Sequence, residues 1–254
     1  MKLTNLFESK ESSSGISIKD VFYEEGKQGR EGFKVLQNFQ SLAPDGVALD
    51  EWKGDLTLED LPLTSLEGFP KKVNGRITLE RLPSLESLEG IGEANEVSLG
   101  GLKIKNFEGL KSAKWLSVTH CKLESFDGLP SNIQNFFVGN CAVGSFKGFP
   151  EFVANFKMIG KLYGSNGFSF SKIHEHIHAA GELEFDDVDV DEDSGVLGFL
   201  KIKQLYKVAF KPTWGKQESL VKAFEIVNKY LPEGDIIDCQ NELIDAGLDK
   251  HAKM

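Results

Sequence analysis

A short pattern of apolar positions recurs along the middle of the chain at a nearly constant interval. Each copy reads apolar-x-Ser/Asn-Leu/Phe-x-Gly-apolar, and the glycines stand at 68, 90, 109, 128 and 148, so successive steps are 22, 19, 19 and 20 residues. A repeat of this length predicts stacked coils, because one coil cannot bury its own apolar side and needs neighbours to cover it. The copies occupy residues 63–70, 85–91, 104–110, 123–130 and 143–150.

Ahead of each glycine motif lies a second block, in which apolar and polar residues alternate before the chain turns. In 97–104 and in 116–123, apolar residues occupy the first, third, sixth and eighth places. Alternation with a period of two predicts a short strand with one buried face. The same block occurs in 56–63 and 136–143, and with one extra residue in 77–85. We therefore expect the strands of successive coils to form one parallel sheet.

These residues resemble the leucine-rich repeat, LxxLxLxx(N/C)xL, which recurs about every 20 to 29 residues. Cys121 and Cys141 occupy its Asn/Cys position, and the resemblance covers residues 55–165. It implies an α/β solenoid, with stacked coils and a parallel β-sheet on one face. The sequence of the second half of each repeat also resembles the short irregular repeats of proteins from large tailed bacteriophages.

The two ends of the chain depart from the repeat and predict caps, which stacked coils need because their terminal faces would otherwise expose core. Apolar residues at 220, 224, 227 and 231 fall on one helical face, and Asp235 is the expected N-cap of a second helix. Residues 183–190 fit the strand template again, and 200–205 are the expected last coil. We expect a flexible arm at 1–17, an N-terminal cap at 18–54, a leucine-rich-repeat-like solenoid at 55–211 and a C-terminal helical cap at 212–254.

The alternation also predicts which side chains leave the sheet on its solvent side. Trp115 and Phe137 fall on this face, where large aromatic residues are typical anchors of protein interfaces. The alternative is that a terminal helix or an inserted loop buries them. The predicted partner-binding residues on this face are Trp115, Asn135, Phe137, Thr119, Arg76 and Glu80.

Composition narrows the classes of partner. The 254 residues contain 29 basic and 39 acidic side chains, a net charge of −10, which disfavours binding to nucleic acid. The sequence predicts no membrane span and no signal peptide, so we expect a cytoplasmic protein, acting as a monomer. The three cysteines lack CxxC spacing and predict neither a disulfide framework nor a zinc site, and Cys121 and Cys141 are expected to be buried neighbours. No cofactor is expected.

Two segments carry partial metal-binding patterns. His174, Glu175 and His178 match H-E-x-x-H, in which two histidines hold zinc and the glutamate activates water. A zinc hydrolase needs a long helix and a third ligand, whereas this segment is short, so we expect an inserted helical turn with Ile173 and Ile177 facing inward. The acidic run 184–193 lacks the glycine of a calcium loop and is expected to be a solvated edge. We therefore expect no metal.

Three functions follow from these patterns. The first is a non-enzymatic scaffold that binds a protein partner on the exposed face of its sheet. The second is a phage virion or capsid-interior component, because residues 1–8 resemble capsid-targeting peptides of tailed phages and Leu6, Phe7 and Glu8 resemble a prohead-protease cleavage site. In that case the protein occupies the host cytoplasm or the virion. The third is a metal-dependent hydrolase that uses the histidine segment.

Overall fold

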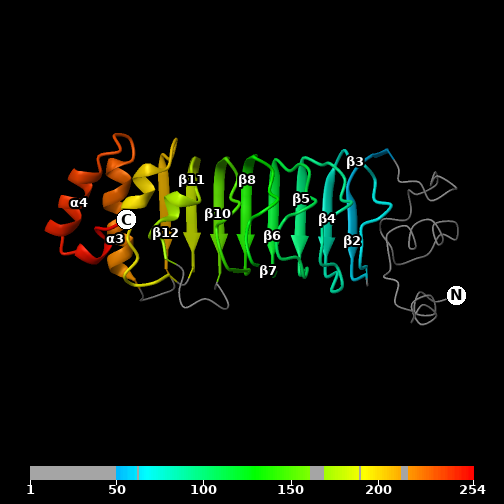
Figure 1. The fold of residues 1–254 in the computed structure, drawn as a ribbon, viewed down its shortest axis with the longest axis horizontal. Coiled ribbons are helices and arrows are strands. Elements are labelled where there is room, and N and C mark those ends of the chain that lie inside the picture. The colour runs from blue at the N-terminus through cyan, green and yellow to red at the C-terminus, as the bar shows by residue number, and fades with distance from the viewer. Residues whose placement is uncertain (1–49, 62, 161–168, 189, 213–216) are drawn as a thin grey trace.

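The computed structural model describes residues 50–254 except 62, 161–168, 189 and 213–216. The predicted arm at 1–17 and all but the last residues of the predicted N-terminal cap lie outside these residues. Within them the chain forms a parallel β-solenoid of about five turns, followed by two helices. Figure 1 shows the strands side by side in a row, with the helices covering one end.

One eight-stranded parallel sheet runs along the solenoid, and its strand order follows the chain from the first coil to the last. Leu58, Leu79, Leu99 and Val118 lie opposite one another in register and are buried, as the alternation predicts. The strands are β2 (Leu56–Glu59), β4 (Arg76–Glu80), β5 (Glu96–Gly100), β6 (Trp115–Thr119), β8 (Asn132–Gly139), β10 (Phe152–Ile159), β11 (Ala180–Asp186) and β12 (Lys207–Lys211).

Short two-residue strands stack on other sides of the coils. β1 (Glu51–Trp52) pairs with β3 (Lys72–Val73), and β7 (Lys122–Leu123) pairs with β9 (Ala142–Val143), both in parallel. The ladder also continues past each long strand: the N–H of His120 donates to the carbonyl of Gly139 at 3.0 Å, and the N–H of Arg81 to that of Gly100 at 2.8 Å. Stacking therefore satisfies backbone groups around the coil as well as along the main sheet.

The glycine motif of the repeat is a capped β-turn. The carbonyl oxygen of Phe126 accepts a hydrogen bond from the N–H of Leu129 at 3.3 Å. Gly128 lies between them with a φ of +86°, which glycine adopts without the steric penalty of a side chain. The hydroxyl of Ser125 accepts from the N–H of Asp127 at 3.3 Å. The other four repeats show the same i to i+3 bond and the same Ser or Asn contact.

These turns correct the expected α/β architecture in one respect. The glycine half of each repeat forms a tight turn, so no residues remain for a helix on the back of the coil. Among the described coils, helix is limited to two 3-10 segments, η3 (Ile173–Glu175) and η4 (Leu197–Lys201). The stacked coils and the parallel sheet are present, whereas the leucine-rich-repeat type of coil, with helix on its back, is not seen.

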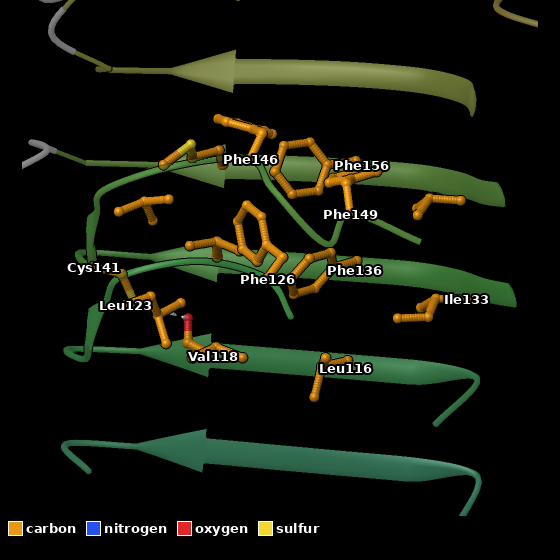
Figure 2. Packing of buried hydrophobic residues seen from close by; sticks show 14 of the residues in the cluster. Leu116, Val118, Leu123, Phe126, Ile133, Phe136, Cys141, Phe146, Phe149 and Phe156 are labelled. Carbon is orange, nitrogen blue, oxygen red and sulfur yellow. Dashed lines mark hydrogen bonds between the residues drawn. The ribbon is translucent and has the colours of Figure 1, made fainter. Parts of the chain in front are cut away.

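A row of aromatic rings fills the later coils. Phe126 lies 5.4 Å from Phe136 and 5.3 Å from Phe146 between ring centroids, in edge-to-face arrangements, and Figure 2 shows these rings meeting between successive coils. Edge-to-face pairs add stability beyond the burial of their area. The row continues through Phe156, Phe185 and Phe170 into the C-terminal helices.

The C-terminal cap contains both predicted helices, α3 (Glu218–Tyr230) and α4 (Ile236–Asp245), with the short η5 (Asp249–His251) after them. Leu220, Phe224 and Val227 are buried, and the side chain of Asp235 accepts from the N–H of Asp238 at 3.0 Å as the expected N-cap. Strand β12, however, begins after the residues expected to form the last coil. It pairs in parallel with β11 from Lys207 to Lys211, and the side chain of Asn228 on α3 bonds to the backbone of Val208.

Candidate binding groove on the sheet face

The register of the sheet aligns outward side chains into columns. Trp115 lies between Glu96 and Asn135 in one column, and Phe137 lies between Ser117 and Lys157 in the next. The expected outward direction of Trp115 is confirmed, since 55% of its surface is exposed. Phe137 is half-buried. No helix or inserted loop among the described residues covers this part of the sheet in Figure 1.

A groove of about 530 Å³ crosses the strands on this face. It runs from Arg76 on β4 to Glu184 on β11, and its middle consists of uncharged groups from β5, β6, β8 and β10. Since neighbouring strands lie about 4.8 Å apart, five steps between these strands give a groove roughly 24 Å long. The lining side chains on the outward columns are Arg76, Glu96, Ser98, Trp115, Ser117, Asn135, Phe137, Asn155, Lys157, Glu182 and Glu184.

Glycine determines the position of the Phe137 ring. A Cβ atom on Gly139 would lie 2.9 Å from both Cε1 and Cζ of Phe137, and 3.3 Å from the methyl carbon of Thr119. The ring therefore lies over the backbone of its own strand, in space that any other residue at 139 would fill. This contact holds the ring along the floor of the groove, beside the more exposed Trp115.

Two asparagines supply polar groups next to the aromatic residues. The side-chain nitrogen of Asn155 donates to the side-chain oxygen of Asn135 at 3.0 Å, across the β8 and β10 strands. This bond leaves the amide nitrogen of Asn135 and the amide oxygen of Asn155 without a partner among the residues that the structure describes. The N–H groups of Asn135 and the amide oxygen of Asn155 are therefore available to a bound molecule.

The charged side chains of the groove are neutralised within the protein. Arg76 and Glu96 form an ion pair at 2.7 Å, and Lys157 donates to Glu184 at 3.1 Å. Lys211 also donates to Glu184, and these two lysines hold the pKa of that carboxyl below its usual range. Since its charges already have partners, the groove suits a ligand with an uncharged or apolar centre.

Four of the six predicted partner-binding residues line this groove: Trp115, Asn135, Phe137 and Arg76. Thr119 and Glu80 lie on the same sheet but outside the groove. Thr119 stands between Gly100 and Gly139, and Glu80 accepts from Arg81 at 2.6 Å.

The residues at the far end of the groove are not among the six predicted from the sequence. Asn155, Lys157, Glu182 and Glu184 lie on β10 and β11, in the same outward columns as Trp115 and Phe137. The signal that would have found them is the same alternation, continued through 152–159 and 180–186. The repeat is less regular in this part of the chain, so the alternation was not followed there.

The histidine segment has a different geometry from a helical zinc motif. His174 lies in the single 3-10 turn η3, and His178 lies beyond its end, so the two residues do not share a helical face. Ile173 and Ile177 are buried as expected, and burial lowers the pKa of His174. The described residues contain no group of three or more histidine, cysteine or acidic side chains placed to hold a metal.

Cys121 and Cys141 are buried on adjacent coils, as predicted from the repeat. The N–H of Cys121 donates to Sγ of Cys141 at 3.4 Å, and Sγ of Cys141 contacts the carbonyl of Gly139 at 3.4 Å. The contact with Cys121, together with burial, raises the pKa of the Cys141 thiol. These thiols therefore pack as small apolar groups in the core.

The fold and the groove define a parallel β-solenoid with a hollowed sheet face. Searches of protein-family models, of curated proteins and of solved structures found no match to this chain. Among the described residues, none of the helices combines the length and apolar character required to cross a membrane.

Proposed function

We propose that this chain is a non-enzymatic scaffold that binds a protein partner in the groove on its sheet face. The observation that carries the proposal is Trp115, a tryptophan 55% exposed in a groove of about 530 Å³, with Phe137 beside it. Exposed aromatic residues clustered at the centre of a groove are typical of residues that dominate binding energy. A preformed sheet surface also loses little conformational entropy on binding.

The proposed partner contributes an extended segment with apolar or uncharged polar residues at its centre. An extended chain advances about 3.4 Å per residue, so roughly seven residues fill a groove of about 24 Å. Apolar side chains of the segment cover Trp115 and Phe137, and its backbone pairs with the free amide groups of Asn135 and Asn155.

The relationship to leucine-rich repeats is part of this proposal, supported by the leucine spacing and by Cys121 and Cys141 in the Asn/Cys position. The phage-virion alternative rests on residues 1–8, which lie outside the described residues. The metal-hydrolase alternative has no support from the geometry of η3. The scaffold is therefore the function that the structure favours.

The test is partner capture with the double variant Trp115→Ala/Phe137→Ala. We expect partner binding to weaken by at least about thirtyfold, since hot-spot truncations cost about 2 kcal/mol or more. Binding to the native protein should persist at about 1 M salt, where the Debye length is about 3 Å, because the groove's ion pairs are internal.

The matched control replaces two large exposed apolar residues elsewhere, Tyr206→Ala/Ile237→Ala. It should bind the partner as the native protein does. Thermal unfolding of Trp115→Ala alone should be nearly unchanged, because an exposed side chain contributes little to stability. Equal capture by both double variants, or unfolding of Trp115→Ala at a much lower temperature, would refute the proposal.

A further inference from the structure

A second groove, of about 830 Å³, lies away from the sheet face, where the chain turns after the strands end. It is formed by the segments that follow β5, β6 and β8 on three successive coils, with Glu86 from the coil before them. In Figure 1 this region is the lower edge of the solenoid, beside β7. Its lining residues differ from those of the sheet-face groove, so the two surfaces can be occupied independently.

Several cations on the solenoid have a carboxylate on the neighbouring coil. Arg76 pairs with Glu96 at 2.7 Å, Lys105 with Glu124 at 2.9 Å, and Lys147 with Asp127 at 3.1 Å. Each pair joins residues 19 or 20 positions apart, so complementary charges stack between coils. These pairs neutralise the three cations.

Within the described coils, Lys103 and Lys122, which line the second groove, have no such pair. Gly100 and Thr119 are register partners, and the two lysines each follow three residues later, at equivalent places on adjacent coils. Both are exposed, and within the described part of the chain neither ammonium group has an ion-pair or hydrogen-bond partner. Because equivalent positions on parallel coils lie about 4.8 Å apart along the stack, one extended anionic segment can reach both cations.

The local charge is opposite to that of the molecule. Three lysines and two glutamates line the groove, in a protein whose net charge is −10. Since Lys105 is already paired with Glu124, Lys103 and Lys122 are the cations available to a ligand. A positive patch on an acidic protein attracts acidic partners selectively and repels basic ones.

The floor of the groove is apolar, and its far end is open. Leu102, Leu123 and Val143 line it from the core, and the coil beyond Lys122 carries Ala142 and Gly144, whose small side chains leave room. An inorganic anion would use only the lysines, whereas this shape also accommodates apolar side chains.

We propose that this groove binds an extended acidic peptide segment of a protein partner, in which carboxylates alternate with apolar residues. The carboxylates pair with Lys103 and Lys122, and an apolar side chain lies over Ala142 and Gly144. This site is additional to the sheet-face groove, so the solenoid can hold two partner segments at once.

The experiment measures fluorescence polarisation of a labelled eight-residue peptide of alternating aspartate and leucine, with the full chain. We expect saturable binding that weakens about tenfold or more in Lys103→Glu/Lys122→Glu, since both attractive pairs become repulsive. Raising the salt from about 0.05 M to about 0.5 M should weaken binding by a similar factor, because the ion pairs are exposed.

The matched control is Lys201→Glu/Lys203→Glu, which reverses two exposed lysines on η4 and after it. It should bind the acidic peptide as the native protein does, and a peptide with lysine in place of aspartate should not bind. Three results would each overturn the inference: no saturable binding to the native protein, equal loss in the control variant, or full competition by inorganic phosphate at a concentration equal to that of the peptide.

Discussion

Small residues at the coil turns decide how closely successive coils stack. Gly128 illustrates this at one position: its φ is +86°, and a Cβ atom there would lie 2.4 Å from the backbone nitrogen of Glu108 on the preceding coil. The glycine therefore serves two purposes, a left-handed turn and a close contact between backbones. A larger residue at this position would disfavour the left-handed turn and would prevent the close contact.

We predict that Gly128→Ala destabilises the protein by at least about 3 kcal/mol, through backbone strain of about 1 to 2 kcal/mol and additional overpacking against the neighbouring coil. The matched control is Gly247→Ala, where φ is +71° but no atom lies within 4 Å of an added Cβ. It should lose only the strain contribution. Urea unfolding of both variants measures the difference, and equal losses would show that coil contact has no role.

At the scale of elements, a buried histidine joins two parts of the C-terminal cap to the solenoid. Nδ1 of His251 lies 2.8 Å from the carbonyl oxygen of Ser194, and Nε2 lies 3.1 Å from the hydroxyl of Ser219 on α3. A carbonyl oxygen only accepts hydrogen bonds, so Nδ1 carries the proton and Nε2 accepts from the serine. His251 thus connects η5, α3 and the segment before η4 in its neutral form.

This contact predicts a pH dependence of stability. Burial lowers the pKa of His251 below its usual value, with Lys250 and Lys253 acting in the same direction and the contacts with Ser194 and Asp193 opposing it. The unfolded chain therefore binds the proton more tightly, so stability is complete above about pH 6.5 and falls as the pH drops through the folded-state value. His174 acts in the same direction.

The measurement is the free energy of unfolding between about pH 7.5 and pH 5, in the native protein and in His251→Asn. Asparagine keeps a donor for the Ser194 carbonyl but does not titrate. The variant should be less stable at pH 7.5 and should lose less stability on acidification. A slope identical to that of the native protein would show that His251 does not contribute to the pH dependence.

For the whole molecule, the cap protects the last coil from solvent and from other chains. The side chain of Asn228 on α3 donates to the carbonyl of Val208 at 2.7 Å and accepts from its N–H at 2.9 Å, as a further strand would. Phe224 packs 5.1 Å from Phe199 and 5.3 Å from Phe170. The cap thus closes both the backbone edge and the aromatic core.

We predict that ending the chain after Pro212 makes the protein aggregate, because an open β-strand edge and exposed core rings favour association between chains. Light scattering and size-exclusion chromatography measure this, with the full chain as reference. A monodisperse truncated protein that unfolds at the same temperature as the full chain would contradict the role of the cap.

Much of the sheet and part of the groove are predictable from local spacing. Trp115 and Asn135 point outward because Leu116 and Phe136 point inward, and a period of two makes each direction determine the next. The expected α/β class followed from the resemblance to leucine-rich repeats, whereas the pattern of Ser125, Phe126 and Gly128 by itself reports apolar spacing and does not specify a helix. Strand β12 lies after the expected last coil, because its pairing with β11 is a contact between coils that the local pattern does not specify.

The sequence by itself determined the coil length, the buried face of each strand and the two terminal helices, because apolar periodicity and capping are local properties of the chain. Only the tertiary structure decided which residues become neighbours across coils. The groove extends from Arg76 to Glu184 because parallel register aligns side chains across six strands, and the same stacking places Lys103 and Lys122 at equivalent positions on adjacent coils. Such contacts depend on how coils stack, which no single repeat specifies.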